Sequence, residues 1–297
     1  MRITNRMIAD SNLRGMNGNL AGIAKLNEQI SSGRAVTRPS DNPSGTSTAM
    51  RTRQDLTANT QYAANIGDAA TTLAAADTAL GTMGEMLLRV RNLTTAAASN
   101  GSQTPGAYEA MATEVDSIRE GMIALANRTV NGRPVFGGVT SGAAAYSAAG
   151  AFLGRADTDV TTRISDAETI TVGVPGPTAF GDAAAGEEDV FALLSRISGL
   201  MTATPPGDLT NVLDALDVAQ QRMSASRSVV GMQVNRIESV KAVNADQALA
   251  LTGQLSEVED VEPAKAYLEL NVLRNGYQAA LTATSQSIQT SLVDFIR

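Results

Sequence analysis

The sequence predicts a mainly α-helical chain: a long antiparallel helical bundle or coiled coil formed by the N- and C-terminal arms, with a small β-rich inserted domain. Apolar side chains recur every three or four residues along both arms, the period of a helix with one buried face. Glycine and proline gather in short connectors between these stretches. Residues 131–186 instead carry many glycines and short alternating fragments, which favour strands.

The first predicted helix covers Leu13 to Ile30 and carries one apolar stripe with three- and four-residue steps. Gly15, Gly18 and Gly22 lie inside it, and each costs about 1 kcal/mol of helix stability relative to alanine. We therefore expect this helix to need a partner. The stripe consists of Leu13, Met16, Leu20, Ile23 and Ile30, with Leu26 beside it.

A connector rich in proline and glycine, residues 31–45, separates this helix from a longer one. Thr46 or Ser47 is the expected N-cap, and the second helix should run to Ser99. A third helix over residues 107–130 should fold back as an antiparallel hairpin. The second helix has a coiled-coil seam of Ile66, Ala69, Leu73, Ala76, Leu80, Met83, Leu87 and Val90, and the third has one of Tyr108, Met111, Val115, Ile118, Met122 and Leu125.

The middle of the chain changes pattern. Thr169 to Val174 alternates apolar and polar residues and predicts a strand, while Val160–Ile164 and Val135–Phe136 are weaker strand candidates. Residues 174–177 read as a turn. These fragments predict a small β-rich or irregular module that projects from the helices.

Helical periodicity resumes at Glu187 and stops before Pro205. A very long helix should begin after Asp208, a suitable N-cap, because apolar residues then recur every seven positions, which favours left-handed supercoiling. Pro263 should kink or break this helix, with Asp260 as a candidate cap for the final helix. The seven-residue series is Leu209, Leu216, Met223, Val230, Ile237, Asn244, Leu251 and Val258.

The last predicted helix keeps its apolar stripe to the final residues, where most chains fray. We therefore expect the two terminal stripes to bury themselves against other subunits, whereas the stripes over 47–130 and 208–255 have the simpler explanation of an intramolecular core. The predicted interface residues of the last helix are Tyr277, Leu281, Ile288, Leu292 and Phe295, and the rest of its stripe includes Tyr267 and Leu270.

Composition excludes several classes of function. The chain has no cysteine and no histidine, so disulfides, thiolate chemistry and the usual zinc sites are excluded, and we expect no metal and no cofactor. A net charge of −7 with scattered basic residues argues against nucleic acid or an anionic membrane as partner. Neither a membrane-spanning segment nor a cleaved signal peptide is expected from the apolar runs.

Carboxylates are the remaining candidates for catalysis. Asp214 with Asp217, Glu187 to Asp189, and Glu257 to Asp260 all lie among helix-forming residues at positions expected to face solvent. Glu187 to Asp189 also suits the first turn of a helix, where negative charge is favourable. We expect these groups to be solvated helix charges and the chain not to be an enzyme.

Several segments resemble the flagellin superfamily, and in particular the flagellar hook-associated protein 3 family. Residues 12–45, which end in the sequence RPSDNPSG, are similar to that family's N-terminal signature. Residues 130–138, VNGRPVFGG, resemble its junction with the outer domain, and the final SLVDFIR resembles its terminal helix. The resemblance covers the two helical arms, roughly 1–138 and 187–297, and implies a structural component that joins hook to filament.

The resemblance also implies an organisation and partners. Residues 1–45 and 256–297 would form an inner assembly domain, 46–130 and 187–255 a helical bundle, and 131–186 an outer domain. The chain would form a homo-oligomeric ring, contact hook-associated protein 1 on the hook side and flagellin on the filament side, and bind a flagellar export chaperone before type III export to the extracellular flagellum. A small filament flagellin is the alternative within the superfamily, and a cytosolic coiled-coil adaptor the alternative outside it.

Overall fold

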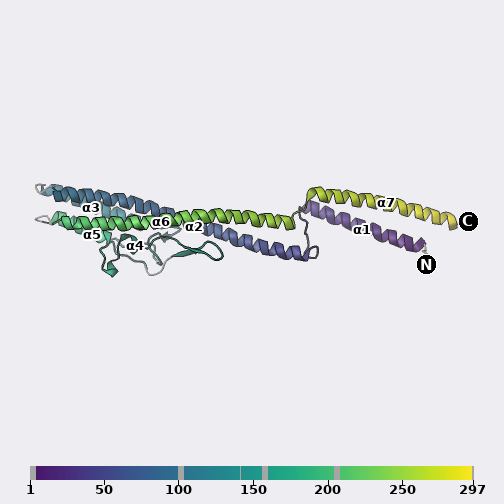
Figure 1. The fold of residues 1–297 in the computed structure, drawn as a ribbon, viewed down its shortest axis with the longest axis horizontal. Helices are drawn as coiled ribbons and strands as arrows, with labels where there is room; N and C mark the ends of the chain where they lie inside the picture. The colour runs from purple at the N-terminus through teal and green to yellow at the C-terminus, as the bar shows by residue number, and fades with distance from the viewer. Residues whose placement is uncertain (1–4, 100–103, 141, 156–159, 204–207, 296–297) are drawn as a thin grey trace. The chain divides into compact units, whose positions relative to one another are not determined.

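The computed structural model of the chain describes residues 5–99, 104–140, 142–155, 160–203 and 208–295, apart from side chains close to the two ends. It divides into two compact units. The terminal unit combines Met1–Ala58 with Gln247–Arg297, and the central unit is Asn59–Asp246. Two long helices, α2 (Pro43–Ser99) and α6 (Thr210–Glu259), run through both units (Figure 1).

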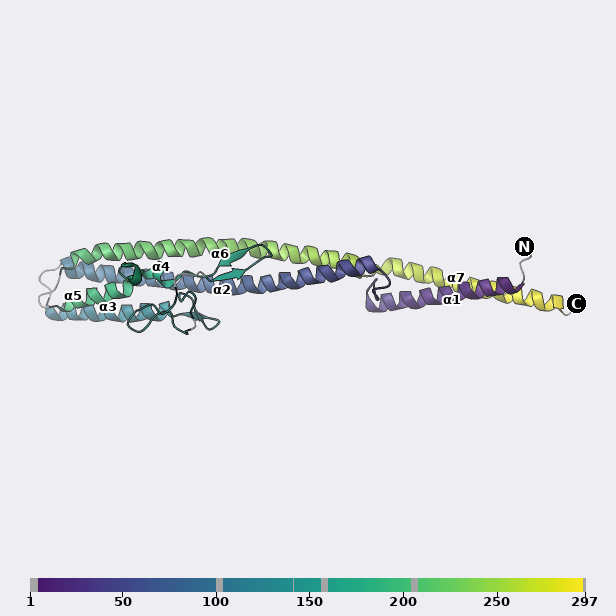
Figure 2. The same cartoon turned by 90° about the horizontal axis from the view of Figure 1, so that it is seen from below.

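In the terminal unit, α1 (Asn5–Ser32) and α7 (Pro263–Phe295) lie side by side and antiparallel, with both chain ends at the same end of the pair (Figures 1 and 2). The glycines predicted to weaken α1 are therefore compensated by a partner helix. One of them lies at a close contact, because a Cβ on Gly22 would lie 2.8 Å from Leu273 Cδ1 and that leucine side chain would have to move.

The connectors on either side of this helix pair are tied to each other. The Ala35 amide donates to the Glu259 carbonyl (2.7 Å), and the Val261 amide donates to the Gly33 carbonyl (3.0 Å). Arg53 adds an ion pair with the largely buried Glu259 carboxylate (2.7 Å). The connector between α1 and α2 thus pairs through its backbone with the connector between α6 and α7. We call the two connectors together the paired connector.

Helix ends in this region differ in detail from the prediction. The side chain of Asn42 accepts the Gly45 amide (2.9 Å), so α2 begins at Pro43 and the predicted caps Thr46 and Ser47 are wrong. Proline is favoured in a first turn, where its missing N–H is not needed. The same reason explains Pro263, which breaks the C-terminal arm and starts α7.

The central unit packs α2 and α6 with two shorter helices, α3 (Pro105–Ala126) and α5 (Val190–Thr202) (Figure 2). Arg227 pairs with Asp77 (2.8 Å) across α2 and α6. Tyr108 donates to the Ala97 carbonyl (3.2 Å) and so joins α3 to α2. All eight predicted seam residues of α2 are buried, and so are the first six of the seven-residue series, which begins just before α6 and continues along it. This burial confirms the predicted periodicity.

One buried layer of the α2–α6 seam is polar. Asn59 Nδ2 donates to the Asn244 carbonyl (3.3 Å), and Asn244 Nδ2 donates to the Asn59 carbonyl (3.2 Å). Both side chains are buried, and the exchange satisfies one donor of each amide. A reciprocal pair of this kind forms only when the two residues face each other, so it specifies one register of the two helices.

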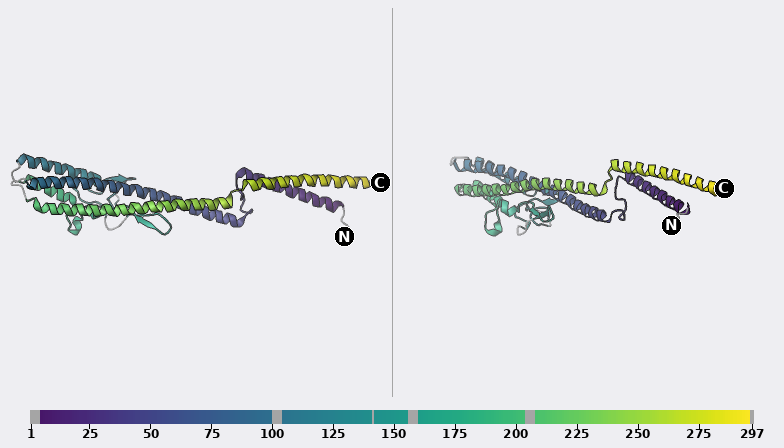
Figure 3. Two further views of the ribbon diagram at one scale, coloured as in Figure 1. Left: turned by 45° about the horizontal axis from the view of Figure 1, so that its top comes forward. Right: turned by 45° about the vertical axis from the view of Figure 1, so that its right-hand side comes forward.

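The insert contains two small hairpins beside the helices (Figure 3). Strand β1 (Thr129–Val130) pairs with β2 (Arg133–Pro134), and β3 (Thr161–Arg163) pairs with β4 (Thr169–Thr171), both antiparallel. The predictions around Thr169 and Val160 are confirmed in shorter form, but Val135–Phe136 follows β2 and is not itself a strand. A short helix, α4 (Gly176–Phe180), and a 3-10 turn at Ala183–Ala185 lead towards α5.

Aromatic side chains dock the insert on the helices. Tyr146 lies with its ring centroid 5.0 Å from Phe191 of α5 and 5.8 Å from Phe180 of α4, in edge-on geometry. Phe136 contacts Phe180 in the same way (5.2 Å). Arg119 of α3 secures this region, because its guanidinium donates to the Phe191 carbonyl (3.0 Å). The few aromatic residues of the chain are thus concentrated where the insert meets the bundle.

Candidate assembly surfaces

The contact between α1 and α7 is a narrow apolar seam. Its buried centre is Leu26 with Ala266 and Leu270, and the residues packed around it are Ile23, Ile30, Val261 and Leu273. Burying a leucine side chain contributes roughly 1.5–3 kcal/mol, so this small centre is a modest source of stability for two helices of such length. Other apolar residues of the pair remain accessible to solvent.

The predicted N-terminal stripe divides between two environments. Met16, Ile23 and Ile30 are half-buried towards α7, and the Met16 sulfur accepts a weak hydrogen bond from Thr284 (4.0 Å). Leu13 and Leu20, which lie seven residues apart, are exposed on a neighbouring face of α1. Leu26, which the sequence placed beside the stripe, is the residue that α7 buries.

The predicted C-terminal residues are placed only in part. Tyr277 is half-buried and Leu281 is exposed. The backbone of α7 continues as helix to Phe295, but the side chains of Ile288, Leu292 and Phe295 lie outside the described residues.

A further apolar face of α7 was not predicted from the sequence. Leu268 and Val272 are 67% and 62% exposed, and Ala279 is exposed on the same side. We call these three residues the outer α7 face. They are spaced four and seven positions apart, which places them on one face of a helix. A second apolar series, through Leu270 and Tyr277, is more prominent in the same stretch of sequence. A helix with two apolar faces has more to bury than its one partner in the chain covers.

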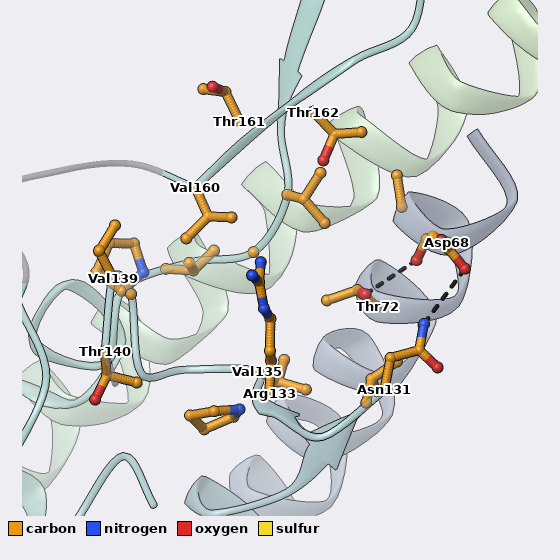
Figure 4. Close-up of a pocket in the computed structure, with 18 of the residues that line it drawn as sticks. Asp68, Thr72, Asn131, Arg133, Val135, Val139, Thr140, Val160, Thr161 and Thr162 are labelled. Atoms are coloured by element: carbon orange, nitrogen blue, oxygen red, sulfur yellow. Dashed lines mark hydrogen bonds between the residues drawn. The ribbon is translucent and has the colours of Figure 1, made fainter. Parts of the chain in front are cut away.

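A pocket beside the insert lacks the arrangement of a catalytic site. It is a pocket of about 600 Å³ between α2 and the insert, with valine and threonine walls (Figure 4). Asp68 is the one carboxylate among the described residues that line it, and it accepts a hydrogen bond from Asn131 Nδ2 (3.3 Å). Arg133 points into the same space (Figure 4). The pocket therefore has one acidic and one basic side chain on its walls. Among the described residues that line it, no nucleophile is hydrogen-bonded to a base.

The carboxylates considered for catalysis lie apart from that pocket. Asp217 pairs with Arg91 (2.8 Å), and Asp214 and Glu257 are exposed on α6. Across the described residues, no three acidic side chains gather closely enough to hold a metal ion. None of the described helices has an apolar stretch long enough to cross a bilayer.

Comparison with known proteins identifies both helical arms. Residues 3–141 match the model of the bacterial flagellin N-terminal helical region, and residues 213–296 match that of the bacterial flagellin C-terminal helical region. The chain belongs to the flagellin superfamily. The two matches end on either side of the segment that contains most of the insert, so the superfamily signal lies in the paired helices.

Among members of the flagellin superfamily, the chain is similar to flagellar hook-associated protein 3 of Escherichia coli, with 28% identity over 288 residues that cover 88% of this chain and 89% of that protein. It is also similar to the flagellin of Bacillus subtilis, with 24% identity over 98% of this chain and 99% of that one. The crystal structure of hook-associated protein-3 from Legionella pneumophila matches with a TM-score of 0.62 at 12% identity, over 70% of this chain and 98% of that one. That structural likeness supports the fold.

Proposed function

We propose that this chain is a structural component of the bacterial flagellum that joins the hook to the filament. The observation that carries the proposal is the similarity to hook-associated protein 3 along nearly nine-tenths of the chain, in both helical arms together. The flagellin of Bacillus subtilis is a more distant relative by identity, so the role of a small filament flagellin is the second candidate.

Assembly proceeds by burial of the terminal helices against neighbouring copies. The residues that take part are Leu13, Met16, Leu20, Ile23 and Ile30 on α1, Tyr277, Leu281, Ile288, Leu292 and Phe295 on α7, and the outer α7 face. Support comes from the exposure of Leu13, Leu20 and Leu268 in the isolated chain, because removing apolar area from water contributes about 25 cal/mol per Å². Residues 1–45 and 256–297 act as the inner assembly part, and 131–186 faces outward.

The partners follow from this position in the flagellum. Copies of the chain form a ring, with hook-associated protein 1 on the hook side and flagellin on the filament side. Before assembly, an export chaperone binds the C-terminal helix, and the chain leaves the cell through the flagellar export pathway. The narrow α1–α7 seam supports this route, since a helix pair with little buried surface unfolds and refolds easily.

The chain acts without catalysis. Support comes from its lack of histidine and cysteine and from the ordinary environments of Asp214, Asp217 and Glu257. Replacing these three carboxylates together by alanine should leave flagellar assembly at the wild-type level.

Deletion of the gene tests the proposal. Hooks should remain intact while flagellin monomers accumulate in the culture medium, because the filament then has no junction to grow from. Loss of filament subunit mass itself would favour a filament flagellin. Recovery of the wild-type chain only from the cytosol, and never from sheared flagella, would favour a coiled-coil adaptor and contradict both flagellar roles.

A further inference from the structure

The pocket between α2 and the insert has the size of a binding site for a small molecule. Its volume of about 600 Å³ lies within the range of roughly 300–1,000 Å³ that is usual for pockets that enclose a ligand. Its walls come from α2, from the β1–β2 hairpin and from the β3–β4 hairpin with the residues that follow it (Figure 4). All of these segments belong to the central unit, so the whole site lies inside one compact unit.

Valine side chains form much of the wall. Val135 and Val174 are buried. Three further valines of the lining are half-buried, namely Val130, Val160 and Val172. A wall of this kind accepts the apolar body of a ligand, because removing apolar surface from water is favourable.

Two opposite charges stand on different walls of the pocket, and neither is neutralised. Arg133 of β2 points into the space (Figure 4), and its guanidinium makes no hydrogen bond or ion pair with any described residue. Asp68 of α2 accepts the side-chain amide of Asn131 (3.3 Å), but no described Lys or Arg lies within ion-pair distance of it. Both charged side chains are exposed, so a ligand can reach them. A ligand with a single charge would pair with one of these groups and be repelled by the other.

A neutral polar group lies beside the two charges. The hydroxyl of Thr162 points into the pocket (Figure 4) and has no hydrogen-bond partner in the part of the chain that the structure describes. The hydroxyl of Thr140 is already used, because it accepts the Gly142 amide (3.1 Å). A free hydroxyl both donates and accepts, so it can serve the N–H or the C=O of an amide. The pocket therefore suits a ligand that has an amide group between charged ends.

The geometry points to a short apolar peptide with free ends, about two or three residues long, as the ligand of this pocket. Its carboxylate pairs with the Arg133 guanidinium, whose planar fork matches a carboxylate. Its ammonium group pairs with Asp68, and its side chains cover the valines. A free amino acid carries both charges but has no amide group and less apolar surface. The site does not depend on the hook–filament role proposed above.

Leucyl-leucine and its end-blocked forms test the ligand class on the purified full-length chain by isothermal titration calorimetry. The peptide with both ends free should bind. Acetylation removes the ammonium group and amidation removes the carboxylate, and each should weaken binding about tenfold. Free leucine should bind more weakly than the dipeptide. Equal affinities for the free and the end-blocked peptides, or no binding of leucyl-leucine up to about 10 mM, would overturn the assignment.

Substitutions of the two charged residues should act on matching ends of the peptide. Arg133→Gln should weaken binding of the free peptide about tenfold and leave binding of the amidated peptide unchanged, because no carboxylate remains to pair. Asp68→Asn should do the same for the free and the acetylated peptide, while its amide oxygen still accepts from Asn131. Arg128→Gln is the matched control, since Arg128 is exposed next to the same hairpin but does not line the pocket. All three variants should keep the wild-type thermal midpoint.

A tryptophan reporter places the binding event, because the wild-type chain has no tryptophan. Thr161→Trp puts one on an exposed residue of the pocket lining, and its emission should shift as leucyl-leucine is added. Ser117→Trp, at an exposed position on α3, should show no shift. Equal shifts from the two reporters, or unchanged binding in Arg133→Gln and Asp68→Asn, would overturn the site. An effect of Arg133→Gln alone would indicate a simple carboxylate and overturn the peptide as the ligand.

Discussion

Asp189 caps α5 with a carboxylate that is only 8% exposed and accepts the Phe191 amide (2.9 Å). Burial raises the pKa of Asp189 to about 6, although the Phe191 amide and the guanidinium groups of Arg119 and Arg222 act in the opposite direction. Burial also raises the pKa of the neighbouring Tyr146, whose hydroxyl has no hydrogen-bond partner among the described residues. At neutral pH the central unit thus holds a charge that its surroundings only partly compensate.

Asp189→Asn should stabilise the protein at neutral pH. Asparagine caps helices as well as aspartate and carries no charge to desolvate. Between the ordinary pKa of 3.8 and about 6 the folded state binds more protons than the unfolded state, so wild-type stability falls as pH rises through this range. The variant should be more stable by roughly 1–3 kcal/mol above pH 7 and by little below pH 4. Urea unfolding followed by circular dichroism at pH 4 and 7.5 measures the difference.

Asp189→Ala is the control, because it removes the same charge together with the cap, which contributes about 1 kcal/mol. Its advantage over wild type at pH 7.5 should therefore be smaller than that of Asp189→Asn. An asparagine variant that is less stable than wild type at pH 7.5, or a difference that does not change with pH, would contradict the assignment.

The buried surroundings of Asp189 and Tyr146 could not have been predicted from the sequence. Tyr146, Phe180 and Phe191 are separated by irregular chain, and no periodic pattern relates them. Their contacts depend on the path of the insert, which is set by glycines at positive φ such as Gly150 and Gly181. Asp189 was recognised only as one of three acidic residues suited to a helix first turn, and its burial results from the insert that covers it.

At the level of elements, the Asn59–Asn244 pair sets the alignment of α2 and α6. Replacing both residues by leucine should raise the thermal midpoint, since leucine burial contributes roughly 1.5–3 kcal/mol per side chain and no orphaned amide remains. The cost should be a loss of unique register. Disulfide mapping between cysteines introduced on the two helices would then detect more than one alignment.

The single variant Asn59→Ala is the comparison for that experiment, and it should lose about 1–2 kcal/mol because it removes one of the two reciprocal hydrogen bonds and leaves a small cavity beside the buried Asn244 amide. A double leucine variant that melts below wild type while keeping one alignment would show that the pair acts through stability alone.

Substitutions on the outer α7 face should impair assembly without changing folding stability. Leu268→Asp with Val272→Asp should change the unfolding free energy by less than about 0.5 kcal/mol, because both side chains are exposed in the monomer. Incorporation into flagella should nevertheless be lost. Leu270→Asp is the matched variant on the opposite, buried side, and it should unfold the α1–α7 pair. Flagella that contain the double variant at normal levels would remove this face from the assembly surface.

Deletion of residues from Tyr277 to the C-terminus removes the second half of α7. The product should be a soluble, largely helical monomer that no longer assembles, because the central unit does not include this segment. Circular dichroism and sedimentation measure the first property, and immunoblots of sheared flagella the second. Incorporation of the truncated chain would show that the last residues are dispensable.

The helices were predictable because their seams depend only on the 3.6-residue period, and every seam residue of α2 and the early α6 series is buried. Which face of a terminal helix meets its partner was not predictable. Leu26 and Leu273 fill the α1–α7 seam, whereas Leu13 and Leu20, which fit the same period, remain exposed. Antiparallel pairing and the close approach at Gly22 decide that choice, and neither is encoded in spacing along one helix.

At the scale of the whole molecule, charge is unevenly distributed. The terminal unit holds 11 basic and 10 acidic residues, net +1, and the central unit holds 12 and 20, net −8. Neighbouring copies in a ring would therefore repel through their central units, and salt screens such repulsion, with a Debye length of about 10 Å at 0.1 M.

Assembly should consequently improve with ionic strength. The protein concentration needed for the purified chain to form multimers should fall several-fold between about 20 mM and 300 mM salt, where screening becomes strong. Sedimentation velocity across a dilution series measures that threshold. A threshold that rises with salt would indicate that attraction between opposite charges, instead of apolar burial against a repulsive background, holds the copies together.

The paired connector has a mechanical consequence. A flagellum turns, so every subunit in it carries torque. In the terminal unit, an unpaired connector between α1 and α2 would let the two helices rotate relative to each other. Instead, Gly33 and Ala35 form backbone hydrogen bonds with Val261 and Glu259, and Arg53 forms an ion pair with Glu259. Torque applied to the two terminal helices is therefore passed to α2 and α6 through both connectors, which are hydrogen-bonded to each other. Although this segment contains a glycine and several prolines, two backbone hydrogen bonds and one ion pair hold it against rotation.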